Sequence, residues 1–219
     1  MSLKVRSVRC KGAPGLGNQD LKFKSADIVL VYGENGCGKS LLCKAVCDAF
    51  AASVSRVGES SLPGEWVIEF DVGNEIGSVS IKKGQVDRLQ MLKRAAQMDQ
   101  KAENCVLAYG ASRISGSGEM AMGLRSVHAV LHDLHLKELR NNVVIIDDFD
   151  SFLSFANKVL WFDHLRRNLG SKGCQLILTV RDEKFVEWAE ELGLGSLVIV
   201  RLAGGDNVIS EGLRAIRKG

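Results

Sequence analysis

The sequence lacks several features that mark whole classes of protein. No apolar run reaches the 18 residues of a bilayer-spanning helix, so we expect no membrane insertion. With only two prolines and no long heptad segment, collagen-like and coiled-coil proteins are excluded. Residues 1–12 alternate charged and apolar side chains and contain no signal-peptide core, which favours a cytoplasmic protein.

Metal-ligand patterns are also scarce. The six cysteines form no C-x-x-C pair, so no zinc ribbon is predicted. Cys43 and Cys47 lie one turn apart in a predicted helix, where small core side chains are expected. His128 and His132 have the i, i+4 spacing of a possible metal pair, but no H-E-x-x-H pattern accompanies them, so a polar helix face is favoured. The net charge of +3 is too weak to predict a nucleic-acid partner.

What remains is the composition of an ordinary soluble globular protein, with 46% apolar and 25% charged residues. A chain of 219 residues fits one domain, or one domain with a subdomain. No internal repeat or low-complexity linker divides it. We therefore predict a single domain over residues 1–219.

Alternating strand and helix patterns predict an α/β protein with a mainly parallel sheet. Continuous apolar runs, typical of buried parallel strands, occur at Ile28–Tyr32, Val143–Ile146 and Leu176–Val180. Helical spacing of apolar residues predicts helices over 41–54, 120–139, 155–169 and 183–192. Further strands are predicted at 3–10, 21–23, 66–72, 79–81, 106–109 and 197–202, with a glycine-rich turn over 11–20 and a polar surface helix over 85–104.

A glycine-rich loop carries the strongest functional signal. Residues 33–40 have the sequence GENGCGKS, which fits the pattern G-x-x-x-x-G-K-[ST]. The glycines let successive backbone N–H groups turn toward a phosphate, and the helix that follows points its positive dipole end at the same anion. Lys39 is expected to reach the β- and γ-phosphates of a nucleotide, and Ser40 to bind Mg²⁺. The predicted nucleotide-binding residues of this loop are Gly33, Glu34, Asn35, Gly36, Cys37, Gly38, Lys39, Ser40 and Leu41.

A pair of carboxylates follows the apolar strand at 143–146. Carboxylates at the end of such a strand are typical of a Walker B segment. In that arrangement Asp147 holds Mg²⁺ through water and Asp148 polarises the attacking water. Asn157-Lys158 is not followed by the aspartate that a guanine-reading motif needs, so a GTPase is not indicated.

The loop G-x-N-G-x-G-K-S resembles that of ABC-type ATPases of the SMC/RecF/OLD class. Three further segments match in the expected order. Residues 115–119 (SGSGE) resemble the ABC signature, residues 147–153 (DDFDSFL) resemble Walker B running into the D-loop, and residues 176–182 (LILTVRD) take the place of the switch segment. Residues 106–113 (VLAYGASR) also resemble a Y-G-x-x-R segment of OLD-like ATPases.

This resemblance implies the fold of an ABC ATPase head. A mainly parallel sheet would be flanked by helices, with an antiparallel β portion at the N-terminus and a helical signature subdomain around residues 83–140. The cofactors would be ATP and Mg²⁺, with Asp148 and Lys39 catalytic. A signature segment would bind the γ-phosphate of ATP held by a second copy of the chain, giving an ATP-dependent homodimer. The signature residues concerned are Ser115, Ser117, Gly118 and Glu119.

The implied function is slow ATP hydrolysis coupled to DNA repair or maintenance, or to defence against phage. The family also implies an output through a partner protein, DNA, or both. Arg113 would be a phosphate or partner contact, or a plain loop charge. The Q-loop glutamine is not assigned, and the candidates are Gln85, Gln90, Gln97 and Gln100.

Three positions depart from the family pattern. Ser115 replaces leucine, Asp148 is one methylene shorter than the usual glutamate, and Arg181 replaces the switch histidine. An arginine cannot accept a proton at neutral pH, so Arg181 is either a permanent cation for phosphate or a surface charge. Two alternatives stay open. The departures at Asp148 and Arg181 favour a nucleotide-gated binding module with little turnover, whereas the missing switch histidine and the atypical signature count against the other, the ATP-binding subunit of an ABC transporter.

Overall fold

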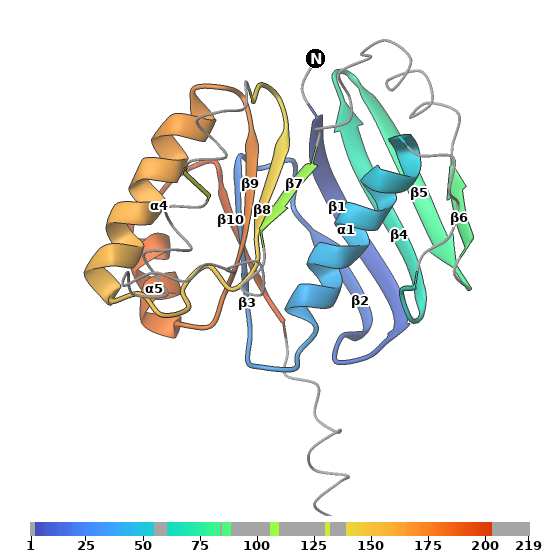
Figure 1. Ribbon diagram of the computed structural model, residues 1–219, viewed down its shortest axis with the longest axis horizontal. Coiled ribbons are helices and arrows are strands. Elements are labelled where there is room, and N and C mark those ends of the chain that lie inside the picture. Colours follow the sequence, from blue (N-terminus) through green and yellow to red (C-terminus); the bar gives the residue numbers. More distant parts are fainter. Residues whose placement is uncertain are drawn as a thin grey trace, which may run out of the picture.

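The computed structural model describes residues 3–54, 61–83, 85–88, 106–109, 130–131 and 139–202. These residues form two five-stranded sheets with helices packed against them, as Figure 1 shows. The α/β class with a parallel sheet and an N-terminal antiparallel portion is thereby confirmed. None of the helices within the described ranges is long and apolar enough to cross a membrane.

The first sheet is antiparallel and has the strand order β2-β1-β4-β5-β6. Its side chains alternate between buried and partly exposed, most regularly in β4, because one face packs on the core. A bulge between Val5 and Ser7 shifts the register of β1. The strands are β1 (Leu3–Ala13), β2 (Gly17–Lys22), β4 (Glu65–Val72), β5 (Glu75–Lys82) and β6 (Gln85–Arg88).

The second sheet is parallel throughout and has the strand order β10-β3-β9-β8-β7. Its central strands are buried along almost their whole length, as the continuous apolar runs predict. The strands are β3 (Ile28–Tyr32), β7 (Val106–Tyr109), β8 (Val143–Ile146), β9 (Gln175–Val180) and β10 (Leu197–Arg201).

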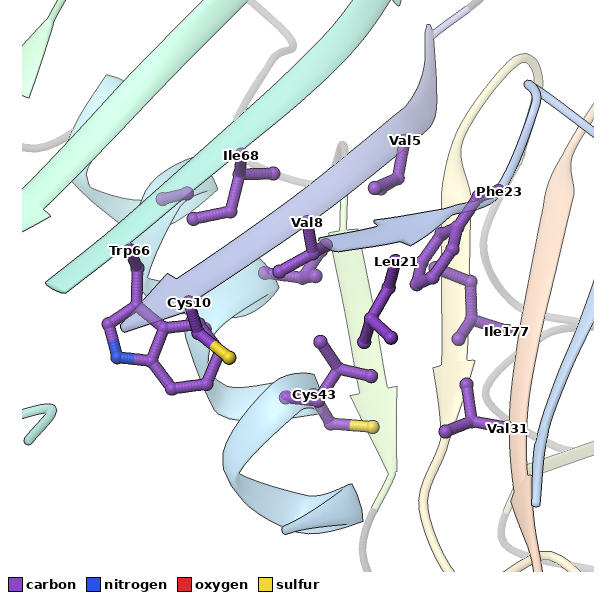
Figure 2. Close-up of a cluster of buried hydrophobic side chains, with 14 of the residues drawn as sticks. Val5, Val8, Cys10, Leu21, Phe23, Val31, Cys43, Trp66, Ile68 and Ile177 are labelled. Carbon is purple, nitrogen blue, oxygen red and sulfur yellow. The ribbon is translucent and has the colours of Figure 1, made fainter. Parts of the chain in front are cut away.

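Helix α1 (Lys39–Val54) lies between the two sheets, whereas α4 (Phe155–Gly170) and α5 (Glu183–Glu191) cover the other face of the parallel sheet (Figure 1). Two apolar cores result. The first joins both sheets through α1, and Figure 2 shows Val8 and Trp66 of the antiparallel sheet in the same cluster as Cys43 of α1 and Val31 of β3. The second joins α4 and α5 to the parallel sheet.

A buried glutamine ties the two sheets together. The side-chain amide of Gln175 donates to the backbone oxygens of Val5 (3.1 Å) and Ala26 (2.8 Å), and its oxygen accepts from the Val5 N–H (2.7 Å). Gln175 is fully buried, and its two bonds with Val5 are buried as well, whereas the bond to Ala26 is partly buried. This amide satisfies backbone groups that neither sheet ladder reaches, and it fixes where β1 crosses the parallel sheet.

Two local predictions are wrong. The helix predicted over 85–104 fails at its start, because Gln85–Arg88 pairs with β5 as an antiparallel strand; residues 89–104 lie outside the described ranges. The turn predicted over 11–20 is mostly strand, since β1 runs to Ala13 and β2 begins at Gly17. Most of the helix predicted over 120–139 is outside the described residues, and Val130 and Leu131 are helical.

Candidate nucleotide-binding site

The glycine-rich loop lies where β3 ends and α1 begins. Gly36 (φ +81°) and Gly38 (φ +93°) adopt left-handed backbone conformations that side chains disfavour, and these turn the loop back on itself. A Cβ on Gly36 would meet no atom within 4 Å, so this side of the loop faces open space. The backbone of the loop is therefore accessible on this side, as a backbone anion site requires.

The loop is supported from behind by the turn between β1 and β2. A Cβ on Gly15 would lie 2.3 Å from the Gly36 oxygen, and a Cβ on Gly38 would lie 2.5 Å from the Leu16 side chain. The Cys37 side chain is buried, and its Sγ would be 2.6 Å from a Cβ on Gly33. The outer face of the loop is thus held by close packing that only glycine permits.

Lys39 begins α1 and is almost fully buried. Its Nζ donates to the backbone oxygens of Gly33 (2.5 Å) and Glu34 (2.7 Å). The ammonium group therefore lies against the backbone at the start of the loop, near the N-terminal, positive end of α1. Ser40 is exposed in the first turn of the helix, where its hydroxyl is free to reach a ligand.

The two carboxylates follow β8, two strands away from β3 in the parallel sheet. One hydroxyl positions both residues: the Thr179 Oγ1–H donates to Asp147 Oδ1 at 2.5 Å and accepts from the Asp148 N–H at 2.7 Å. Asp148 adopts a left-handed backbone conformation (φ +60°), which aspartate tolerates better than most residues. Because the sheet is parallel, the loop and both carboxylates lie at its same, C-terminal edge.

Arg181, the first residue after β9, connects these parts. Its Nε lies 3.0 Å from Asp148 Oδ1, and its Nη1 donates to Asn35 Oδ1 at 3.4 Å. Its Nη2 donates to the hydroxyl of Ser151. Arg181 is thus not a plain surface charge, because its contacts join the loop to the segment after β8.

Asp150 fixes the backbone at Arg181 through hydrogen bonds. Its Oδ2 accepts from the N–H groups of Arg181 (2.8 Å) and Asp182 (2.6 Å), at the start of α5. The buried Oδ1 has no partner among the described residues. Burial alone would raise the pKa of Asp182, but the hydrogen bond and charge of Lys158 outweigh it and hold that pKa below its usual value. The turn that presents Arg181 is therefore fixed by charged groups.

Cys43 behaves as a core residue, as its helical spacing predicts. Burial raises the pKa of its thiol well above the usual value, and the negative charge of Asp147 raises it further. Cys43 lies on α1, one turn beyond Lys39. Cys10 and Cys174 likewise have thiol pKa values raised by burial.

The structure brings together the predicted residues of the loop, Asp147, Asp148 and Arg181. The predicted signature residues Ser115, Ser117, Gly118 and Glu119 lie outside the described ranges, as do Arg113, His128 and His132. Sequence reasoning missed the roles of Thr179 and Asp150. A polar residue in the otherwise apolar strand LILTV was the available signal for Thr179.

The residues present fit a nucleotide with Mg²⁺. The accessible loop backbone and Lys39 supply donors and positive charge for phosphates. Ser40 and Asp147, a hydroxyl and a carboxylate, are hard oxygen ligands. Within the described ranges no three His, Cys, Asp or Glu side chains form a metal site of their own. Mg²⁺ is often held by few protein ligands together with substrate phosphates, and Ser40 and Asp147 are the protein ligands that this site would offer.

Comparison with solved structures gives the same fold. The SMC head bound to the C-terminal winged-helix domain of ScpA has a TM-score of 0.53 at 12% identity, over 84% of this chain and 92% of that one. CbiO1 from Clostridium perfringens, part of the ABC transporter complex CbiONQ, has a TM-score of 0.51 at 12% identity, over 98% of this chain and 94% of that one. At such identity the likeness shows the fold alone.

Comparison with protein families is more specific. No curated protein matches the chain. The AAA_22 family, described as an AAA domain, matches residues 21–185, a range that runs from β2 through the phosphate loop and both carboxylates into α5. The chain therefore belongs to the AAA_22 family and is an AAA-family P-loop ATPase domain with the fold of SMC heads and ABC ATPases.

Proposed function

We propose that the chain is an ATPase of the SMC/RecF/OLD class that binds ATP with Mg²⁺ and closes into a homodimer around it. The observation that carries this proposal is the placement of a phosphate loop, a buried lysine and two carboxylates at one edge of the parallel sheet. In this proposal the described residues form one half of a composite site. The other half is the signature segment at residues 115–119 of a second copy.

Each group at this edge has a defined task. Backbone N–H groups of residues 33–40 and the Lys39 ammonium bind the phosphates. Ser40 and Asp147 hold Mg²⁺, which neutralises the charge on the phosphate oxygens when bound. Asp148 orients and polarises the attacking water, and Thr179 keeps both carboxylates in place through its hydroxyl.

The surface beside the site supports closure against a second copy. Phe152, which follows the carboxylates, is 67% exposed and has a left-handed backbone (φ +61°). Phe155, at the start of α4, is 44% exposed. Two exposed aromatic side chains next to the nucleotide edge are typical of a surface that a partner covers.

The cellular role of dimer closure is proposed from the resemblance to the SMC/RecF/OLD class. It would be DNA repair or maintenance, or defence against phage, exerted through a partner protein or DNA. One structural neighbour is described as an SMC head bound to a domain of ScpA and the other as part of an ABC transporter complex. A partner protein is common to both. A membrane transporter is the alternative that CbiO1 favours, and co-purification with a membrane protein would support it.

Asp148→Asn tests the enzymatic part of the proposal. Removing the base while keeping the shape should lower ATP turnover by about 100-fold or more, because general-base catalysis contributes roughly that much. ATP affinity should persist, and the ATP-bound dimer should accumulate in sedimentation experiments. Phosphate release and sedimentation would be measured together on the variant and on the wild type.

Asp163→Asn is the matched control, since Asp163 is also ion-paired with an arginine but lies on α4. It should turn over ATP at the wild-type rate. Unchanged turnover in Asp148→Asn would rule out Asp148 as the base. A wild-type chain that binds ATP without any turnover would favour a nucleotide-gated binding module.

A further inference from the structure

One guanidinium touches both the phosphate loop and the candidate base. Arg181 contacts Asn35 in the loop, and it contacts Asp148 and Ser151 in the segment after β8. These residues are far apart in the sequence. Any anion that enters the loop next to Asn35 therefore approaches the cation that neutralises Asp148.

The Arg181 backbone is fixed by hydrogen bonds, but the ion pair of its side chain is partly exposed to water. Asp150 anchors the N–H groups of residues 181 and 182. The side chains of Arg181 and Asp148 are 37% and 29% exposed, and an ion pair that water reaches in this way contributes little. The guanidinium is thus presented at one place and can be drawn away by a better partner.

The γ-phosphate of ATP is a better partner for the Arg181 guanidinium than the groups that Arg181 contacts in this structure. It carries more negative charge than a carboxylate, and its oxygens match the parallel N–H donors of a guanidinium. Asp148 offers one oxygen to Nε, and the contact with Asn35 is long at 3.4 Å. An ATP γ-phosphate at the loop would therefore compete successfully for Arg181, whereas ADP, which lacks that group, would not.

We propose that Arg181 distinguishes ATP from ADP by exchanging its ion pair with Asp148 for an ion pair with the ATP γ-phosphate. The exchange frees the Asp148 carboxylate only when a triphosphate is bound. The guanidinium keeps its charge throughout, so no proton transfer is involved. This inference rests on the proposed nucleotide site and makes Arg181 its specificity-determining residue, with Asp150 as the positioning residue beneath it.

The test compares affinities of the full chain for a non-hydrolysable ATP analogue and for ADP, both with Mg²⁺, at a concentration where sedimentation shows monomer. Arg181→Gln should lower affinity for the analogue about 10- to 100-fold, the loss expected for hydrogen bonds to a charged group. Affinity for ADP should stay within about twofold of wild type, because ADP makes no contact with this side chain.

Arg167→Gln is the control, because the Arg167 Nε also pairs with a carboxylate, Asp163 Oδ2 at 2.8 Å, but on α4. It should change neither affinity. The Arg181 Nε–H resonance, identified by its loss in Arg181→Lys, should also move with the analogue and not with ADP.

The outcomes separate the two proposals. A wild-type chain that binds neither nucleotide would contradict the proposed function and the inference with it. A wild-type chain that binds both, while Arg181→Gln weakens both equally or neither, would leave the proposed function standing and overturn the role of Arg181.

Discussion

Lys39→Ala is expected to lower ATP affinity at least about 100-fold, equivalent to roughly 3 kcal/mol. The loop keeps its backbone donors, but the buried ammonium at its mouth is lost. The Gly33 and Glu34 oxygens then also lose the lysine ammonium as a donor, so the loop itself is less well ordered. Isothermal titration calorimetry with ATP and Mg²⁺ measures the effect.

Lys44→Ala is the control for this variant. Lys44 lies on the same helix and forms an exposed ion pair with Asp48 one turn away. The Lys44→Ala variant should bind ATP with an affinity within about twofold of wild type. Exposed ion pairs contribute at most about 1 kcal/mol to stability, and this pair lies away from the phosphate loop. Equal affinities for wild type and Lys39→Ala would show that the loop is not a phosphate site.

Gly15→Ala is expected to weaken ATP binding although Gly15 lies outside the phosphate-loop motif at residues 33–40. The new methyl group would lie 2.3 Å from the Gly36 oxygen, so the phosphate loop must shift. Such overpacking costs about 1–3 kcal/mol, in addition to the roughly 1–2 kcal/mol of a side chain at positive φ. We expect a lower free energy of unfolding in urea and about tenfold weaker ATP binding.

Gly12→Ala isolates the contribution of the clash. Gly12 lies in the same region and has a similar φ (+68° against +76° for Gly15), but a Cβ there would meet nothing within 4 Å. It should show the backbone strain alone and bind ATP normally. If the two variants unfold at the same urea concentration and bind ATP equally, Gly15 does not support the loop.

The parts of the fold that could be predicted are those with a strong local pattern. Continuous apolar runs predict β3, β8 and β9 because buried parallel strands need apolar side chains on both faces. The phosphate loop is similarly local, since its chemistry requires particular residues at fixed spacing.

The misses share a physical cause, which is contact between segments that no local pattern specifies. Residues Gln85–Arg88 are mostly polar and precede a helix-prone stretch, yet a hairpin with β5, in which Gln85 pairs with Lys82, makes them an edge strand. Within the site, Gly15 supports the loop although it is eighteen residues ahead of Gly33. The Thr179 hydroxyl reaches Asp147 across neighbouring strands. None of these contacts leaves a periodic or spaced pattern in the sequence.

Arg181 shows both the strength and the limit of family resemblance. Its place in a segment that resembles the switch of ABC-type ATPases predicts a residue of interest, but the presence of arginine where that family has histidine does not say what it contacts. The structure gives those contacts: the candidate base and Asn35 of the loop. The departure from the family pattern thus becomes a specific hypothesis about how the site recognises a triphosphate.

Calorimetric titration of the wild-type chain tests most directly whether this loop binds ATP together with Mg²⁺. We expect saturable binding of one ATP per chain, much weakened when EDTA removes Mg²⁺, since Ser40 and Asp147 act on the nucleotide through the metal. A titration with ATP and Mg²⁺ that shows no binding up to millimolar nucleotide would contradict this expectation.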